Sequence, residues 1–506
     1  MLAYQYWVWN LIAIAAVALF LFATLRAGQE WDGDFALYIM NARNIAEGLP
    51  YSQTPFIPNP DNAINPASYP AGLPLILAPV YAMFGVDLAK MKAVCLATFV
   101  LSLGFFAAVL RERLPLRFAL ATIVAIGLHP YIWDFKDSIQ SEFAFMLFCY
   151  AALLWVHRMQ DEQIKTSPAM IAGAGIAIAA AWQTRSAGIL LFPAAVLTVL
   201  CHHGRNLFHP TVRNTVVALV IAAVVGASLQ WVFPADVSTY AHYFDGYSVH
   251  ELLGKIRRYL QLDRSLFGGE FMWRVRTVRA LDLTMVVLFG IGFIAQLRRR
   301  ITVFEVFFVG YVLLLLIYPI ALEPARYTLP IWPLFFLYIA SGVYTVATWI
   351  ASHLGAAPAR AFGVAICLGL AANYLFQYRR AHFEPIALSV ENAQSHELFE
   401  AIRTQLPPDA TLLVRKPTIV ALFTGRRATI WPVKFSDEEL WAYIERTNIG
   451  YIVQNMEALD PKVSDDPLDE FVARNGSALR KLFANEWFTL YRIVPRPGPR
   501  AAKLVH

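Results

Sequence analysis

Long apolar runs recur along most of the chain, separated by short polar segments. A helix crosses about 30 Å of hydrocarbon with about 20 residues. Runs that reach or approach this length cover residues 6–25, 88–110, 118–133, 143–156, 169–183, 188–200, 216–233, 281–295, 304–322, 328–350 and 362–376. The pattern predicts a polytopic α-helical membrane protein with about eleven transmembrane helices. A further apolar run, 73–84, is only about 12 residues long and favours a helix lying at the membrane interface.

The pattern changes after residue 378. Alternating residues predict short strands at 411–415, 428–431, 450–454, 481–483 and 487–494, with helical spacing at 395–405, 437–445 and 468–473 between them. The sequence thus divides into a transmembrane domain, 1–378, with outer loops 26–87 and 234–280, and a small extracytoplasmic α/β domain, 379–494. The proline-rich segment 495–506 is predicted to be a disordered tail.

Composition agrees with a membrane protein and excludes soluble enzymes. The 506 residues are 58% hydrophobic and 15% charged, with mean hydropathy +0.49, whereas soluble domains contain about 25% charged residues. The net charge is +6, but no basic surface with interleaved aromatic residues points to nucleic acid. Anionic membrane lipids are the more natural partners of this charge.

Basic residues in short loops indicate the orientation of the chain. Cytoplasmic loops carry an excess of Lys and Arg, and the densest clusters are Arg111/Arg113/Arg117 and 298–300. If the spans alternate, both clusters lie on one side. The pattern therefore predicts a cytoplasmic N-terminus and an exported C-terminal domain, as in a multi-pass protein of the bacterial inner membrane. The basic outer loop 234–280 does not overturn this, because long loops translocate largely regardless of charge.

Two sets of residues invite a metal or disulfide interpretation that the sequence does not favour. The four cysteines lie in or beside predicted spans and fit small core side chains; they are Cys95, Cys149, Cys201 and Cys367. A histidine group, His202, His203 and His209, falls in a predicted cytoplasmic loop that contains no Cys or carboxylate partner. We interpret it as a solvated loop.

The candidate chemistry lies where the first span ends on the outer side. Asp32 and Asp34 follow that span directly. Carboxylates at the mouth of a membrane helix are costly to desolvate and often bind a substrate, an ion or a proton. The alternative is that either residue only caps a helix beginning at Phe35.

Other outer loops add complementary groups. Carboxylates that accept protons, guanidinium groups that bind phosphate and aromatic rings that stack on sugars all fall on the same predicted side. The carboxylates are Asp137 and Glu142, with Lys136 beside them; the guanidinium groups are those of Arg185, Arg258 and Arg326, and the rings those of Tyr38, Tyr69 and Tyr327. In the alternative interpretation, Glu142 caps the fourth span, the arginines extend to the interface and the tyrosines form an interfacial belt.

These motifs, in this order, resemble the GT-C glycosyltransferases, and in particular the bacterial ArnT-like and protein mannosyltransferase-like enzymes. The resemblance rests on Asp34-Phe-Ala-Leu-Tyr38, Ala42-Arg-Asn-Ile-Ala-Glu-Gly48, Tyr69-Pro70-x-Gly72-x-Pro74, Ser141-Glu142 and Arg326-Tyr327-x-x-Pro330. It extends over the whole chain, although each motif is short. One departure is that the family's acidic pair after the first span is here Asp34-Phe35, with the second acid at Asp32.

The resemblance implies transfer of a sugar from a polyprenyl-phosphate donor, such as an undecaprenyl phosphate, to a lipid, glycan or protein acceptor on the non-cytoplasmic face. Asp34 is then the expected base. The donor phosphate is assigned to Arg326 first, followed by Arg185, Lys136 and Arg258. Asp137, Glu142 and Asp32 would orient the acceptor or bind a divalent cation, Mg²⁺ or Mn²⁺, whose need stays open. Sugar or lipid contacts are assigned to Tyr38, Tyr69 and Tyr327.

Three other functions stay open on the sequence alone. A ligase or polymerase of lipid-linked glycans would use the same face and carrier. A secondary transporter would place ionisable groups at the midplane in two similar halves. Here no repeat is visible and the spans lack carboxylates at their centres. The weak exceptions, Asp282 and Glu305, lie near span ends. A non-catalytic scaffold is the third.

Overall fold

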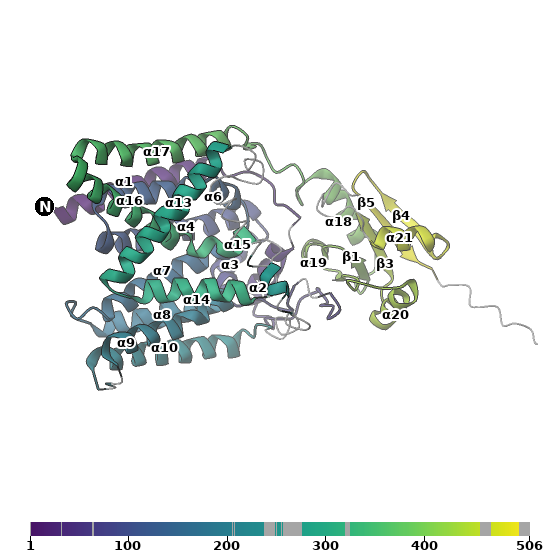
Figure 1. Cartoon of the computed structure of the whole chain (residues 1–506). Coiled ribbons are helices and arrows are strands. Elements are labelled where there is room, and N and C mark those ends of the chain that lie inside the picture. The colour runs from purple at the N-terminus through teal and green to yellow at the C-terminus, as the bar shows by residue number, and fades with distance from the viewer. Residues whose placement is uncertain are drawn as a thin grey trace, which may run out of the picture.

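The computed structural model describes residues 2–31, 33–62, 65–204, 206, 208–236, 248, 250–254, 256, 276–318, 324–455 and 467–494. Figure 1 shows two parts: a bundle of long helices and a smaller domain that contains the β-sheet, located at the end of the bundle away from the N-terminus. Asp32, Arg258 and the tail 495–506 lie outside the described residues.

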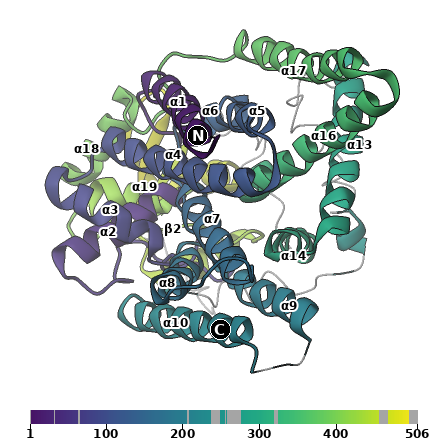
Figure 2. The same ribbon diagram turned by 90° about the vertical axis from the view of Figure 1, so that its left-hand side faces the viewer.

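An apolar helix corresponds to each of the eleven predicted spans. These helices are α1 (Leu2–Ala23), α4 (Leu88–Arg113), α5 (Leu116–Gly127), α7 (Glu142–Met159), α8 (Pro168–Thr184), α9 (Leu191–His203), α10 (Pro210–Val232), α13 (Arg276–Arg299), α14 (Val303–Ile317), α16 (Trp332–Leu354) and α17 (Ala356–Tyr378). Within the described part of the chain, eight helical segments are long and apolar enough to cross a membrane, and α5, α8 and α14 are shorter. In Figure 2, α7 lies near the middle of the bundle, with α8, α9 and α10 grouped at one side.

The third predicted span is not one continuous helix. It ends at Gly127, and a separate short helix, α6 (Pro130–Phe135), follows. Proline has no N–H for a helical hydrogen bond, so the break falls immediately before Pro130. The His129 ring caps the new helix by accepting a hydrogen bond from the Tyr131 amide at 3.1 Å.

Two helices lie in the connection between α1 and α4. The first, α2 (Asp34–Glu47), ends at Gly48, whose φ of 67° suits glycine. The second, α3 (Gly72–Phe84), confirms the short apolar helix predicted over 73–84. A Cβ at Gly72 would lie 2.7 Å from the Thr184 Cα. Glycine at this position therefore allows α3 to pack closely against the end of α8.

The C-terminal domain has a five-stranded mixed sheet in the order β2-β1-β3-β5-β4. Its elements are α18 (Ala393–Gln405), β1 (Thr411–Val414), α19 (Pro417–Thr424), β2 (Arg427–Thr429), α20 (Asp437–Thr447), β3 (Tyr451–Asn455), α21 (Pro467–Arg474), β4 (Leu479–Ala484) and β5 (Phe488–Ile493). Strands β2 and β3 run parallel to β1, and β5 is antiparallel to β3 and β4. The predicted strands and helices are confirmed. Helix α19 was not predicted, because a run of eight mostly apolar residues also fits a loop.

The C-terminal domain and the connection between α1 and α4 share one hydrophobic core. The Trp31 ring packs on Phe399 and Phe488, with ring centroids 5.8 and 5.1 Å apart, and all three residues are buried. The Thr418 hydroxyl, at the start of α19, donates a 2.8 Å hydrogen bond to the Gly33 carbonyl. These contacts fix the domain against the N-terminal end of α2.

Candidate active site

Asp34 is the first residue of α2, and its carboxylate binds side chains on both oxygens. Oδ1 accepts hydrogen bonds from the Tyr69 hydroxyl at 2.8 Å and the Asn65 amide at 2.9 Å. Oδ2 accepts one from Arg326 Nη2 at 2.7 Å. The N-cap is Gly33, which has no side chain with which to cap the helix. Asp34 is therefore part of a polar cluster, and the simple helix-cap alternative does not describe it.

Arg326 lies at the centre of this cluster. It belongs to the short helix α15 (Pro324–Thr328), which precedes α16. Its Nε donates to Glu142 Oε1 and its Nη2 to Gln140 Oε1, both at 2.6 Å. With 9% of the side chain exposed, the guanidinium is enclosed by acceptors. It does not extend to the interface as an anchoring arginine would.

Glu142, the first residue of α7, receives a second arginine. Arg185, in the turn after α8, donates to Glu142 Oε1 at 2.5 Å and to the Ser141 hydroxyl at 3.0 Å. The four formal charges, two carboxylates and two guanidinium groups, cancel. Such balance is needed because an unpaired charge removed from water costs several kcal/mol, about 3–5 kcal/mol where one partner of a buried pair is lost.

Aromatic side chains form one side of the cluster. Tyr38 is one helical turn after Asp34, on the same face of α2, and its ring stacks on Tyr69 with centroids 4.3 Å apart. The Tyr38 hydroxyl donates to Ser141 at 3.1 Å. The Arg185 guanidinium lies over the Tyr327 ring, 5.9 Å from its centroid. All three predicted tyrosines therefore lie at this site.

Electrostatics keep Asp34 ionised. Burial acts to raise the pKa of this carboxyl, but the charge of Arg326, hydrogen bonds from Arg326 and Tyr69 and the charge of Lys416 together hold the pKa below its usual value. Burial, together with the Asp34 charge, raises the pKa of the Tyr38 hydroxyl. Asp34 is thus an anion and Tyr38 a neutral hydrogen-bond donor at neutral pH.

Lys136 and Asp137 lie in a different cluster, although Glu142 is only five residues further along the chain. Asp137 accepts hydrogen bonds from Arg26 Nε at 2.5 Å and from Lys136 Nζ at 2.8 Å. It also accepts one from the Arg26 amide at 2.8 Å. Asp134 completes the group by pairing with Arg26 at 2.6 Å. These contacts tie α6 to the end of α1, so the two residues hold helices together at this position.

The structure adds residues that were not singled out from the sequence. Asn65, Gln140 and Ser141 bind the charged groups directly, and Lys416, from the C-terminal domain, acts electrostatically on Asp34. The first three lie in or beside the motifs quoted above. Lys416 carries no such sequence signal, because only the docking of α19 onto Gly33 brings it near α2. Asp32 and Arg258 fall outside the described residues.

The donor atoms at this site do not fit a divalent cation. Both Asp34 oxygens and Glu142 Oε1 are engaged by Arg, Asn or Tyr donors. Within the described part of the chain, Glu142 Oε2 alone lacks a hydrogen-bond partner among the atoms of these two carboxylates. Mg²⁺ prefers near-octahedral oxygen coordination, so one free oxygen beside two guanidinium groups is a poor site. Here the Arg326 guanidinium bridges the carboxylates.

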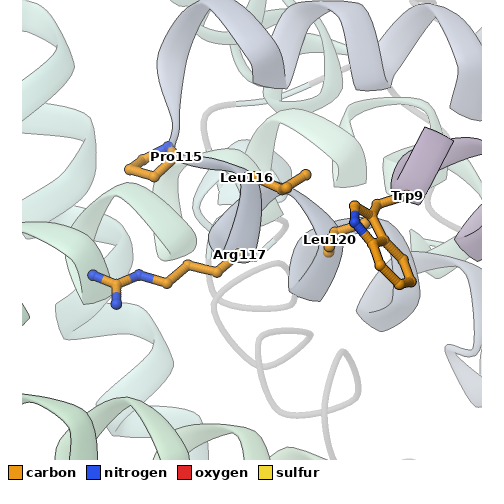
Figure 3. A pocket seen from close by; sticks show the side chains of 5 residues that line it. All are labelled: Trp9, Pro115, Leu116, Arg117 and Leu120. Carbon is orange, nitrogen blue, oxygen red and sulfur yellow. The ribbon is translucent and has the colours of Figure 1, made fainter. Parts of the chain in front are cut away.

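A separate hollow of about 460 Å³ lies on the surface of the bundle, between α1 and the start of α5. Figure 3 shows its lining: Trp9, Pro115, Leu116, Arg117 and Leu120. α5 begins here and its other end leads to α6, on the side of Asp137. The hollow therefore lies at the opposite end of the bundle from the charged cluster and is not part of the candidate active site.

Comparison with known proteins gives a fold but no close relative. No protein-family profile matches the chain, and no curated protein matches it. Among solved structures, the chain is similar to ArnT from Cupriavidus metallidurans bound to undecaprenyl phosphate, at 14% identity and a TM-score of 0.59 over 96% of this chain and 98% of that one.

The archaeal oligosaccharyltransferase of Archaeoglobus fulgidus is also similar. Its apo form matches at 13% identity and a TM-score of 0.57, over 89% of this chain and 70% of that one. Its complex with Zn and sulfate matches at 12% identity and a TM-score of 0.59, over 97% and 74%. The chain is thus a polytopic helical membrane protein with a C-terminal mixed α/β domain, and its fold is similar to those of ArnT and the archaeal oligosaccharyltransferase.

Proposed function

We propose that this protein transfers a sugar from a polyprenyl-phosphate donor, of the undecaprenyl-phosphate type, to a hydroxyl group of a lipid, glycan or protein acceptor. The observation that carries the proposal is the partly buried ion pair of Asp34 and Arg326, 2.7 Å apart. The pair lies where the helical bundle meets the C-terminal domain, in a fold similar to that of ArnT bound to undecaprenyl phosphate.

Asp34 is the proposed general base. An acceptor hydroxyl attacks the anomeric carbon of the sugar, and its proton passes to the Asp34 carboxylate as the new C–O bond forms. A positioned base contributes about 10²–10⁴ in rate. Tyr69 and Asn65 donate to one carboxylate oxygen and Arg326 to the other, which fixes the carboxylate against rotation.

Arginine and lysine side chains are the proposed partners of the donor phosphate. The bond between the anomeric carbon and the phosphate oxygen breaks, and the polyprenyl phosphate leaves with the electron pair. Arg326 and Arg185 already balance the charges of Asp34 and Glu142, so these four residues have no net positive charge for a phosphate. Lys416 adds that charge. Charge-assisted donors aimed at a departing phosphate stabilise the transition state directly.

A single displacement of this kind inverts the configuration at the anomeric carbon. The new bond forms on the face opposite to the departing phosphate, and no sugar–enzyme intermediate intervenes. We also propose that the reaction takes place on the periplasmic face of the bacterial inner membrane, where the C-terminal domain covers the site and shapes its acceptor side. The distribution of basic loops supports this orientation.

The test is a donor panel with purified full-length protein in nanodiscs. Radiolabelled sugars are offered on polyprenyl phosphate and, in parallel, on nucleotide diphosphate, with outer-envelope lipids, glycans and peptides as acceptors. We expect transfer from at least one polyprenyl-phosphate sugar and none from the nucleotide form. Transfer from nucleotide sugars alone would overturn the proposal. Transfer of preassembled oligosaccharides alone would favour a glycan ligase.

A further inference from the structure

Two histidines and a glutamate meet at the end of the bundle opposite to Asp34. His203 ends α9, His209 is the N-cap of α10, and Glu162 lies in the connection after α7. Because α7 begins at Glu142 and has 18 residues, its two ends are about 27 Å apart. This group is therefore remote from the proposed site of sugar transfer.

The three side chains present their ligand atoms to one another. Glu162 Oε1 lies 3.7 Å from His203 Nδ1 and 3.7 Å from His209 Nε2. One ligand atom from each of the three residues lies within 4.8 Å of the others. The two imidazole rings are stacked, with centroids 4.0 Å apart and an angle of 18° between their planes.

His203 is the observation that requires an explanation. Its side chain is 9% exposed, yet among the described residues its buried Nε2 has no hydrogen-bond partner. The 3.7 Å to Glu162 exceeds the length of a hydrogen bond. A buried polar group without a partner is costly, and buried groups are normally satisfied by the protein, water or an ion. The nitrogen that faces Glu162 is Nδ1, for which the described residues provide no hydrogen bond within normal length either. A ligand bound to Nδ1 would give this buried ring a polar partner.

We propose that Glu162, His203 and His209 bind a divalent transition metal ion of the zinc class. Imidazole nitrogen and carboxylate oxygen are established zinc ligands, and two histidines with one carboxylate leave the fourth tetrahedral position for water. Calcium and magnesium, which prefer all-oxygen coordination, do not suit this donor set.

The distances from Glu162 are close to those of a metal site, but one of the stacked rings must turn so that the lone pairs of both imidazoles point at one ion. Zinc–ligand distances of about 2.0–2.1 Å place tetrahedral donors about 3.4 Å apart, a few tenths of an ångström less than the present separations from Glu162. The Glu162 side chain is 62% exposed and free to move. His209 Nδ1 accepts from the Thr211 amide at 3.3 Å. A metal bound to Nε2 would leave the proton on Nδ1, which could then no longer accept from the Thr211 amide. The protein would lose this weak helix cap and gain a coordination bond.

The bound ion would join two connections that are separate in the sequence. One follows α7 and the other links α9 to α10, which pack against each other in the bundle (Figure 2). An ion that binds the folded protein but not the unfolded chain raises stability according to its concentration and affinity. From the sequence, the histidine loop was interpreted as solvated because it contains no carboxylate partner; the structure brings Glu162 to it from a different loop.

The test is a Co²⁺ titration of the full-length protein, purified in detergent with a tag that contains no histidine. Tetrahedral Co²⁺ gives intense visible absorption. We expect one equivalent to bind, Zn²⁺ to displace it, and Zn²⁺ to raise the melting temperature. Glu162→Gln, His203→Gln and His209→Asn should each weaken binding by about 100-fold or more. Asparagine in place of His209 keeps an N-cap for α10, so that variant should remain folded.

His202→Gln is the matched control. His202 is adjacent to His203, but its Nε2 contacts the Ile301 carbonyl at 2.6 Å, so its loss should leave Co²⁺ affinity unchanged. Absence of the visible bands in the wild type would overturn the proposal. So would a loss of affinity in His202→Gln equal to that in His203→Gln. Sugar transfer is not the readout, so this test is independent of the proposed function.

Discussion

Arg326 Nη2 donates to Asp34 Oδ2 at 2.7 Å, although 292 residues separate the two in the chain. The pair joins α2, in the connection between α1 and α4, to α15, directly before the tenth apolar segment. Glu142 binds the same guanidinium through Nε. One arginine therefore connects the starts of three helices, and a proposed base and phosphate-binding group lie in direct contact.

Arg326→Lys tests the role of the planar guanidinium. Lysine keeps the charge but cannot donate along the separate directions to Asp34, Glu142 and Gln140. We expect the transfer rate to fall by about 10²–10³, comparable with the loss of one transition-state donor. Donor binding and rate are measured on monodisperse protein. Arg43→Lys, which alters only an exposed pair with Glu47, is the control. An unchanged rate in Arg326→Lys would remove the phosphate role.

Lys416→Met tests the contribution of the C-terminal domain through pH. Arg326, Tyr69 and Lys416 lower the pKa of Asp34, so an ionised Asp34 is lost only as the pH falls through that lowered value. Removing the Lys416 charge raises the pKa of Asp34. The acid limb of the profile of kcat/KM against pH should therefore move to higher pH.

The control for that shift is Lys434→Met, an exposed lysine of the same domain. Its profile should coincide with that of the wild type. Equal shifts in both variants would indicate a general effect of net charge and contradict a specific role for Lys416. Donor affinity, measured in parallel, should fall only in Lys416→Met.

Asp137→Asn distinguishes the helix-joining cluster from the site of chemistry. Asp137 is 2% exposed and pairs with Arg26 and Lys136, so removing its charge should cost about 3–5 kcal/mol of stability. Asp134, 65% exposed, should cost at most about 1 kcal/mol when changed to Asn. Thermal unfolding measures both. A selective loss of turnover in Asp137→Asn, without loss of stability, would place Asp137 in the reaction.

The stereochemical outcome is a further prediction. Direct displacement should give a product whose anomeric configuration is opposite to that of the donor sugar. Proton NMR of the product, with a donor of known configuration, measures this. Retention would require two displacements and a second nucleophile, which would contradict the assignment of Asp34 as base alone.

Much of the fold followed from hydrophobic spacing alone. The positions of the apolar helices and of the five strands depend on local periodicity, which the sequence displays directly. Pro130 interrupted a predicted span because its ring and missing N–H end a helix locally. Helix α19 was not predicted because eight mostly apolar residues do not distinguish a helix from a buried loop.

The candidate site was predicted in part for a topological reason. Alternating spans place Asp34, Glu142 and Arg326 on one side, so their meeting could be expected. The directions in which the side chains point could not be predicted from the sequence. Asp137 and Glu142 are five residues apart, yet the turn after α6 directs the first toward Arg26 and the second toward Arg326. Lys416 reaches Asp34 only through tertiary docking, which no local pattern records.

The central claim is that Asp34 removes the acceptor proton during transfer from a polyprenyl-phosphate sugar. Single-turnover transfer is compared for wild type, Asp34→Asn and Asp61→Asn in nanodiscs, with donor binding measured on the same samples. Asp61 is an exposed carboxylate in the same connection between α1 and α4. We predict that Asp34→Asn binds donor but loses about 10²–10⁴ in rate, while Asp61→Asn matches the wild type. Transfer at the wild-type rate by folded Asp34→Asn would contradict the account.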